Sequence, residues 1–283
     1  MNTNKSIKNK IINYANNDER VRAVILNGSR ANPKVTPDKY QDFDILFVVK
    51  NFDSFLNDKN WISFLGNSIL QQLPDEMILG NDENENKISY AYLMIFEDRN
   101  RVDLTLFPKE KFDEFEFDSL TIVWLDKDGL FQNFPEASDK DYYVSKPSQR
   151  QFLEVCNEFW WTSTNVAKGL ARHEILYAKD MMETFVRRMF MKVIEWKIGY
   201  ENNWKVSVGK SGKFVKKYLD STLYDRILKT YSNAILENNW EALFEMIYFF
   251  KELQLQIAGK LQFDTNPEEM NSSTEYIKEL SRE

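Results

Sequence analysis

The chain is 283 residues long, 43% of them apolar and 14% aromatic, which is enough to bury one large core or two ordinary ones. Its 37 basic and 44 acidic residues give a net charge of −7, which argues against a nucleic-acid partner because phosphate binding needs a basic surface. The single cysteine, Cys156, excludes an internal disulfide and a cysteine-rich zinc site.

The sequence predicts no export and no membrane attachment. No apolar stretch near the N-terminus has the form of a signal peptide, and no apolar run is long enough to cross a membrane. We therefore expect a cytoplasmic protein with no membrane partner and no obligate protein partner. The acidic balance suits a cationic small-molecule substrate, because opposite charges speed the encounter.

The first half of the chain has the pattern of a small sheet with flanking helices. Apolar and alternating segments predict strands, and helical spacing predicts helices before the first strand and between the second and third. The strands are expected at 21–27, 44–50, 88–97, 101–107 and 120–125, and the helices at 7–15, 52–56 and 61–72. This mixture predicts an α+β fold with a small mixed sheet.

After residue 145 the pattern changes to long helix-periodic segments. These segments are expected at 151–168, 175–200, 214–219, 223–231 and 240–261. We therefore expect a domain boundary near residue 146 and a helical bundle over residues 146–265. The polar residues 266–283 are expected to form a weakly held C-terminal tail.

A glycine-serine turn follows the first expected strand. Gly28 lets the backbone approach a phosphate closely, and consecutive N–H groups beside Ser29 form a small nest for an anion. Arg30 is either a clamp for the phosphate or a structural partner of Asp38, and both interpretations stay open at this point.

An Asp-Phe-Asp motif opens the second expected strand. Positions i and i+2 of a strand point to the same face, so Asp42 and Asp44 can aim both carboxylates at one point. Asp103 lies on the strand 101–107, which pairs with 88–97 through a turn. If that strand lies beside the Asp42 and Asp44 strand, three carboxylates cluster, and such a set can hold divalent ions that bind a triphosphate. For each aspartate, a solvated strand position is the simpler alternative.

Together these motifs resemble the nucleotidyltransferase superfamily that includes DNA polymerase beta. More specifically, the chain resembles the aminoglycoside 6-adenylyltransferases, which modify streptomycin. The narrower resemblance rests on blocks between about residues 28 and 219, namely Gly28-Ser29-Arg30-Ala31-Asn32, Pro37-Asp38, Gln41-Asp42-Phe43-Asp44-Ile45, Val102-Asp103-Leu104-Thr105-Leu106, Cys156-Asn157-Glu158-Phe159-Trp160, Lys168-Gly169-Leu170-Ala171-Arg172, Gly209-Lys210 and Lys213-Phe214.

The resemblance implies a nucleotidyltransferase domain over residues 1–145 and a helical substrate- and nucleotide-binding domain after it. It implies transfer of AMP from ATP to a hydroxyl of streptomycin, which gives antibiotic resistance, with Mg²⁺ as cofactor. Asp42, Asp44 and Asp103 are then the catalytic and metal-binding residues, and Asp103 is a metal ligand, a general base or both. The residues that hold ATP in the first domain are then Gly28, Ser29 and Arg30.

In the helical half, Lys210 and Lys213 lie in a glycine-rich segment before an expected helix. The resemblance favours them as contacts of the triphosphate, whereas the pattern alone favours a solvated basic face. Substrate contacts are also expected in this half, with ordinary exposed carboxylates and a core aromatic as the alternatives. These candidates are Glu158, Trp161, Glu174 and Asp180.

Two other functions stay open. The nearer is a nucleotidyltransferase that acts on another acceptor, such as a different aminoglycoside, a lincosamide or a protein side chain. The farther is a catalytically silent nucleotide-binding module. Three like charges that converge on one site argue against the silent module, because such charges repel each other and have no use there without a cation.

Overall fold

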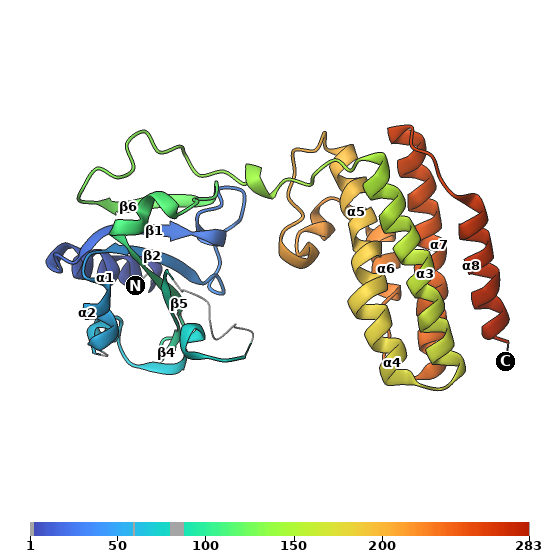
Figure 1. Ribbon diagram of the computed structural model, residues 1–283, viewed down its shortest axis with the longest axis horizontal. Coiled ribbons are helices and arrows are strands. Elements are labelled where there is room, and N and C mark those ends of the chain that lie inside the picture. The colour runs from blue at the N-terminus through green and yellow to red at the C-terminus, as the bar shows by residue number, and fades with distance from the viewer. Residues whose placement is uncertain (1–2, 59, 80–87, 283) are drawn as a thin grey trace. The chain divides into compact units, whose positions relative to one another are not determined.

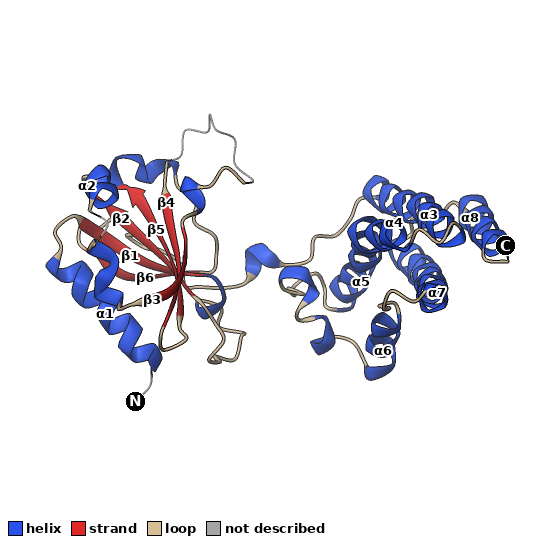
Figure 2. Ribbon diagram, turned by 90° about the horizontal axis from the view of Figure 1, so that it is seen from below, coloured by secondary structure: helices blue, strands red, loops and turns tan. Residues whose placement is uncertain are grey.

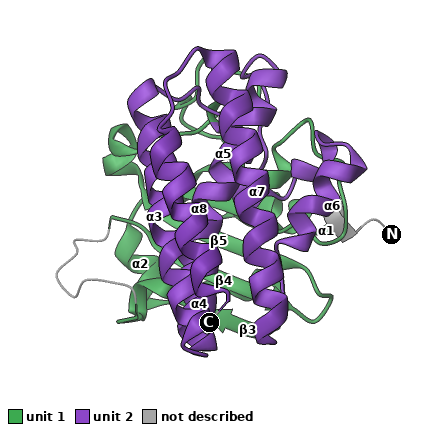
Figure 3. Ribbon diagram, turned by 90° about the vertical axis from the view of Figure 1, so that its right-hand side faces the viewer, with its two compact units in different colours: residues 1–141 green, residues 142–283 purple. Residues whose placement is uncertain are grey.

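The structure of the chain is a computed structural model that describes residues 3–58, 60–79 and 88–282. It divides into two units, Met1–Asp141 and Tyr142–Glu283, which Figure 3 shows in green and purple. The first unit contains a sheet with flanking helices, and the second is helical (Figure 2). The expected α+β class with a helical C-terminal region is confirmed.

Within the described residues, the first unit is built on a six-stranded sheet with the order β3-β4-β5-β2-β1-β6. Its strands are β1 (Val21–Asn27), β2 (Phe43–Val49), β3 (Ser68–Gln72), β4 (Tyr90–Phe96), β5 (Arg101–Pro108) and β6 (Thr121–Asp126). The β2–β5 pair is parallel, and the other neighbouring strands are antiparallel. All five expected strands are present, with ends that differ by a few residues.

Side chains alternate between two cores on the two faces of this sheet. On β2, Phe43, Ile45 and Phe47 face the larger core, which helices α1 (Thr3–Asn17) and α2 (Phe52–Asn57) cover. The even-numbered residues of β2, among them Leu46 and Val48, face a smaller core lined by phenylalanines from the segment 112–131. This alternation places Asp44 on the face of the smaller core, at the start of the strand.

The prediction of a helix over residues 61–72 is wrong for the second half of that segment. A 3₁₀ helix, Trp61–Leu65, ends at Gly66, whose φ of +119° no helix tolerates, and the chain then enters β3. All residues of β3 are exposed. An edge strand without a buried face has no alternating apolar signal, so the sequence pattern did not reveal it.

The second unit is a bundle in which α3, α5 and α7 pack together and α8 lies along α3 (Figure 1). Its helices are α3 (Gln149–Ala171), α4 (Ile175–Asp180), α5 (Arg187–Glu201), α6 (Ser221–Lys229), α7 (Leu236–Leu261) and α8 (Pro267–Leu280). A π-helical turn, Met181–Val186, interrupts the expected helix 175–200, and the expected helix 214–219 is only a 3₁₀ turn, Val215–Lys217. In the described part of the chain, no helix is long and apolar enough to cross a membrane.

The C-terminal segment is a packed helix where the sequence led us to expect a polar tail. Asn266 caps α8 by accepting a hydrogen bond from the N–H of Glu269, and Pro267 occupies the first turn. Met270 and Ile277 are buried from this helix. A few apolar residues at helical spacing are enough to anchor α8, although its composition is polar.

Candidate active site

Two aspartates lie opposite each other on neighbouring strands. β2 and β5 run parallel, and Asp44 is in register with Asp103. Residues in register on adjacent strands point to the same face, which here also carries Leu46 and Phe107. The structure therefore contains the strand adjacency that a cluster of these carboxylates requires.

Asp42 joins this pair through Arg101. The guanidinium of Arg101 donates from Nε to Oδ1 of Asp103 at 2.8 Å and from Nη2 to Oδ2 at 2.7 Å. Its Nε also lies 3.7 Å from Oδ2 of Asp42. One arginine thus bridges the carboxylates of Asp42 and Asp103.

The electrostatics of the cluster reflect this crowding of like charges. The pKa of Asp44 is raised to about 6, chiefly because burial disfavours the charged form and also because the carboxylates of Asp103 and Asp42 lie close. Burial also raises the pKa of Asp42, and Asp103 acts in the same direction, while Arg101 opposes both. A site that raises the pKa of its carboxylates in this way favours a compensating cation.

Gly28 brings the glycine-serine turn directly against these carboxylates. The 3₁₀ turn Gly28–Arg30 follows β1, and Gly28 has a φ of +71°. A Cβ at this position would lie 2.3 Å from Oδ2 of Asp44, which is closer than a carbon and an oxygen can approach. Glycine is therefore required here both by the backbone angle and by the neighbouring carboxylate.

Arg30 holds the loop that returns the chain to β2. Its Nε donates to the carbonyl of Asp42 at 2.9 Å, its Nη2 donates to the carbonyl of Gln41 at 2.6 Å, and its guanidinium lies 3.8 Å from the ring of Phe43. Gln41 in turn donates from Nε2 to the carbonyl of Ser29 at 3.1 Å. Among the described residues, the hydrogen-bond acceptors of Arg30 are the backbone carbonyls of Gln41 and Asp42 and not the carboxylate of Asp38, and contact of Arg30 with a phosphate stays a prediction.

The donor chemistry of the cluster fits Mg²⁺, which prefers carboxylate oxygens and needs only one or two of them when a nucleotide supplies further oxygens. In the part of the chain that the structure describes, no three histidine, cysteine, aspartate or glutamate side chains are placed to hold a metal ion together. Both carboxylate oxygens of Asp103 instead accept hydrogen bonds from Arg101. The residue types therefore fit the ion, whereas Asp103, the third expected ligand, is paired with the guanidinium of Arg101.

Sequence reasoning missed the roles of Arg101 and Gln41. A usable signal existed for Arg101, because it lies two positions before Asp103 on one strand and so shares its face. The role of Gln41 depends on the path of the loop between Arg30 and Asp42, which no local pattern specifies.

In the second unit, Lys210 and Lys213 are exposed on a tight loop. Gly209 has a φ of +70°, and a Cβ there would lie 2.7 Å from the ring of Phe214. The N–H of Phe214 donates to the carbonyl of Val208 at 2.8 Å, which closes the loop. Both lysines are thus exposed, with Nζ of Lys213 5.1 Å from the centre of the Phe214 ring, and their contact with a triphosphate stays a prediction.

The expected substrate residues are all exposed. Trp161 is 69% exposed, whereas its neighbour Trp160 is buried and donates from Nε1 to Oε1 of Gln254 at 2.8 Å. The core alternative is therefore excluded for Trp161. Glu158 lies three positions before Trp161 on α3, and their contact with a substrate stays a prediction.

The other two expected substrate carboxylates lie at the ends of α4. Glu174 precedes its first turn, and Asp180 is its last residue. Asp180 accepts a hydrogen bond from Oγ1 of Thr184 at 3.1 Å, so its only assigned partner in the described structure is local. Their exposure leaves both carboxylates accessible to a cation.

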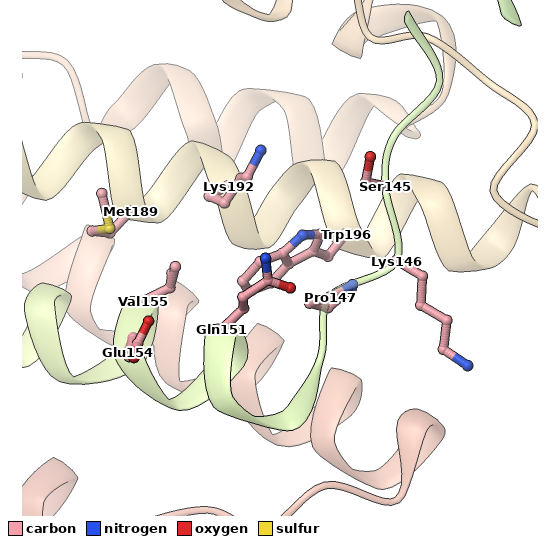
Figure 4. Close-up of a pocket in the computed structure, with 9 residues that line it drawn as sticks. All are labelled: Ser145, Lys146, Pro147, Gln151, Glu154, Val155, Met189, Lys192 and Trp196. Carbon is pink, nitrogen blue, oxygen red and sulfur yellow. The ribbon is translucent and has the colours of Figure 1, made fainter. Parts of the chain in front are cut away.

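Two cavities lie beside α3 and α5 in the second unit. The first, of about 390 Å³, is lined by Ser145, Lys146, Pro147, Gln151, Glu154, Val155, Met189, Lys192 and Trp196 (Figure 4). The second, of about 500 Å³, shares Val155, Met189 and Lys192 with it. Ser211 and Gly212, from the loop that carries Lys210 and Lys213, line the second cavity together with Arg188. None of the four expected substrate residues lines either cavity.

Comparison with known proteins gives matches that span both units. A family model described as streptomycin adenylyltransferase matches residues 1–280. The aminoglycoside 6-adenylyltransferase of Campylobacter jejuni is 39% identical over 264 residues, which cover 93% of this chain and 91% of that protein. The aminoglycoside 6-adenylyltransferase of Bacillus subtilis (strain 168) is 35% identical over 265 residues, 93% of each chain. A crystal structure of an aminoglycoside 6-adenyltransferase from Bacillus subtilis aligns over 97% of both chains, with 30% sequence identity and a TM-score of 0.49.

Proposed function

The chain belongs to the streptomycin adenylyltransferase family, and from this premise we propose that it transfers AMP from ATP to a hydroxyl group of an aminoglycoside. We propose streptomycin as the acceptor and antibiotic resistance as the result. The observation that carries the proposal is the approach of the Gly28 turn to Asp44, which itself lies in register with Asp103. This arrangement offers a phosphate site and a carboxylate site at one place.

The glycine-serine turn is the proposed phosphate site. The first N–H groups of a helical turn have no partner inside the turn. The N–H of Gly28 donates to the carbonyl of Leu120 at 3.1 Å, so those of Ser29 and Arg30 are the proposed donors to phosphate oxygens. Arg30 and Gln41 fix the turn to the strand that carries the carboxylates. The phosphates would then be held at a defined distance from Asp44.

The carboxylates are the proposed reaction centre. A bound Mg²⁺ would neutralise the charge of the phosphate oxygens and polarise the α-phosphoryl group. Asp42 and Asp44 would hold this ion, while Asp103 would complete its coordination, accept the proton of the attacking hydroxyl at a carboxylate oxygen, or do both. The hydroxyl oxygen forms a bond to the α-phosphorus as the bond to pyrophosphate breaks in line.

The second unit is proposed to contribute charge. Lys210 and Lys213 would contact the triphosphate, which their exposure on a tight loop supports. The carboxylates Glu158, Glu174 and Asp180 would pair with cationic groups of the acceptor, and Trp161 would stack on a sugar ring. ATP as co-substrate fits the cytoplasmic location expected from the sequence.

The acceptor is tested by a panel. The protein is incubated with Mg²⁺ and α-labelled ATP together with streptomycin, another aminoglycoside, a lincosamide or a protein. Labelled product with streptomycin alone is the expected result, and labelling of a different acceptor would reassign the substrate. Calorimetric titration of streptomycin at two salt concentrations adds a physical check, because affinity for a cationic ligand falls as charges are screened over roughly 8 to 10 Å.

A further inference from the structure

Arg101 forms hydrogen bonds with Asp103, one of the three proposed catalytic carboxylates. Arg101 is the first residue of β5. Since Phe43 is in register with Val102 on a parallel pair, Asp42 lies opposite Arg101, one position earlier in each segment. Because Arg101 and Asp103 are two positions apart, their side chains share a face. The guanidinium therefore lies between the carboxylates of Asp42 and Asp103.

The contact with Asp103 uses the full hydrogen-bonding fork of the arginine. Two parallel N–H···O bonds of 2.8 Å and 2.7 Å engage both carboxylate oxygens. Charge-assisted bidentate pairs of this kind are directional as well as attractive. A divalent cation that takes an oxygen of Asp103 must therefore share that oxygen with one of these hydrogen bonds or replace it, and in both cases the guanidinium charge opposes the cation.

We propose that Arg101 competes with the divalent cation for Asp103 and thereby sets the affinity of the catalytic carboxylates for metal. Arg101 is a positioning residue, since it acts through Asp103 and Asp42. Its positive charge offsets the repulsion among the three carboxylates in the folded protein. It releases Asp103 when a divalent cation with its nucleotide attracts the carboxylate more strongly. This inference rests on the proposed function, because it assumes that the carboxylates bind a metal ion.

Arg101 is exposed enough for its side chain to move away from Asp103. The Arg101 side chain is 43% exposed, whereas that of Asp103 is 19% exposed. Partly exposed ion pairs are weak, so the competition is modest, and removal of the guanidinium should raise metal affinity roughly two- to fivefold. Arg101→Lys keeps the positive charge but loses the bidentate hydrogen bonding, so it should raise metal affinity by a smaller factor.

The test measures binding of Mn²⁺ without nucleotide, by electron paramagnetic resonance of the unbound ion. Arg101→Gln should bind Mn²⁺ more tightly than the wild type, with Arg101→Lys in between. The matched control is Arg99→Gln, an exposed arginine in the same hairpin, which removes the same charge without touching the carboxylates. Its affinity should stay within twofold of the wild type.

A double-mutant cycle then identifies the contested group. In an Asp103→Asn background, Arg101→Gln should raise Mn²⁺ affinity less than it does in the wild type, because Asp103 has lost its charge and only the weaker contact of Arg101 with Asp42 remains. Circular dichroism and thermal unfolding check that each variant is folded.

Several results would overturn the inference. Equal or weaker Mn²⁺ binding by folded Arg101→Gln would do so, and so would an Arg99→Gln effect as large as that of Arg101→Gln, which would indicate a general charge effect. AMP transfer by the wild type is assayed separately, so these results leave the proposed function standing. Absence of specific Mn²⁺ binding in every folded variant would also overturn the inference, whereas only absence of AMP transfer in its own assay would overturn the proposed function.

Discussion

Gly28 lies so close to Asp44 that a single added carbon would come within 2.3 Å of its Oδ2 atom. The two residues belong to neighbouring antiparallel strands or their ends, since Asn27 of β1 is in register with Asp44 of β2. The contact joins the turn proposed to bind phosphate to the carboxylate proposed to bind metal. Any change that enlarges residue 28 must therefore move one of these parts.

Replacement of Gly28 by Ala tests this contact. The left-handed backbone angle should cost about 1–2 kcal/mol of unfolding free energy. Displacement of Asp44 or of the turn should also lower AMP transfer on the order of 100-fold, because reacting groups tolerate little misplacement. The control is Gly129→Ala, which has a similar φ of +68° but no contact closer than 3.5 Å. It should lose similar stability and keep its activity, whereas equal activity of both variants would exclude a special role for the Gly28 contact.

Asp42→Asn and Asp44→Asn should nearly abolish AMP transfer. Both pKa values are raised in the folded protein, chiefly by burial, so neutral amides should leave stability unchanged or raise it slightly. Turnover and thermal unfolding, measured on the same preparations, separate the two effects. Wild-type turnover in Asp42→Asn would contradict the metal assignment.

The raised pKa of Asp44 predicts a pH dependence of stability in metal-free buffer. Its value rises from 3.8 in the unfolded chain to about 6 in the folded one. Between pH 4 and 6 the folded state therefore binds more protons, so the free energy of unfolding should fall as pH rises through this range. Urea titrations should show a steeper decrease for the wild type than for Asp44→Asn, in which only the smaller contribution of groups such as Asp42 remains. Parallel pH profiles of the two proteins would show that Asp44 titrates normally.

Lys210→Ala and Lys213→Ala should weaken binding of ATP far more than binding of the acceptor. The comparison variant is Lys216→Ala, an exposed lysine close in sequence whose Nζ lies 5.4 Å from the ring of Tyr224. Calorimetry with a non-hydrolysable ATP analogue measures the nucleotide affinity of all three variants. If all three match the wild type, Lys210 and Lys213 belong to an ordinary solvated face.

The sequence predicted those parts of the fold whose signal is local. β1 and β2 are buried apolar runs, and the β4–β5 hairpin has clear alternation, so their positions followed from the pattern. The same alternation correctly placed Asp44 on one face with Asp103 once β5 lay beside β2. Both aspartates are therefore recognisable from the pattern of residues along their strands.

The remaining features depend on contacts between distant segments. β3 is an exposed edge strand without alternation, and α8 is a polar helix held by a few buried residues. The approach of Gly28 to Asp44 depends on the loop that Arg30 holds. Local periodicity does not encode such contacts, because they arise only when two segments meet.

Mass spectrometry of streptomycin after incubation with ATP, Mg²⁺ and the purified protein tests the proposed function most directly. We predict a streptomycin species heavier by one adenylyl group, together with release of pyrophosphate, for the wild type and none for Asp44→Asn. Unmodified streptomycin in the wild-type reaction, with the protein folded and ATP intact, would contradict the proposed acceptor. The same adduct in the Asp44→Asn reaction would contradict the proposed site.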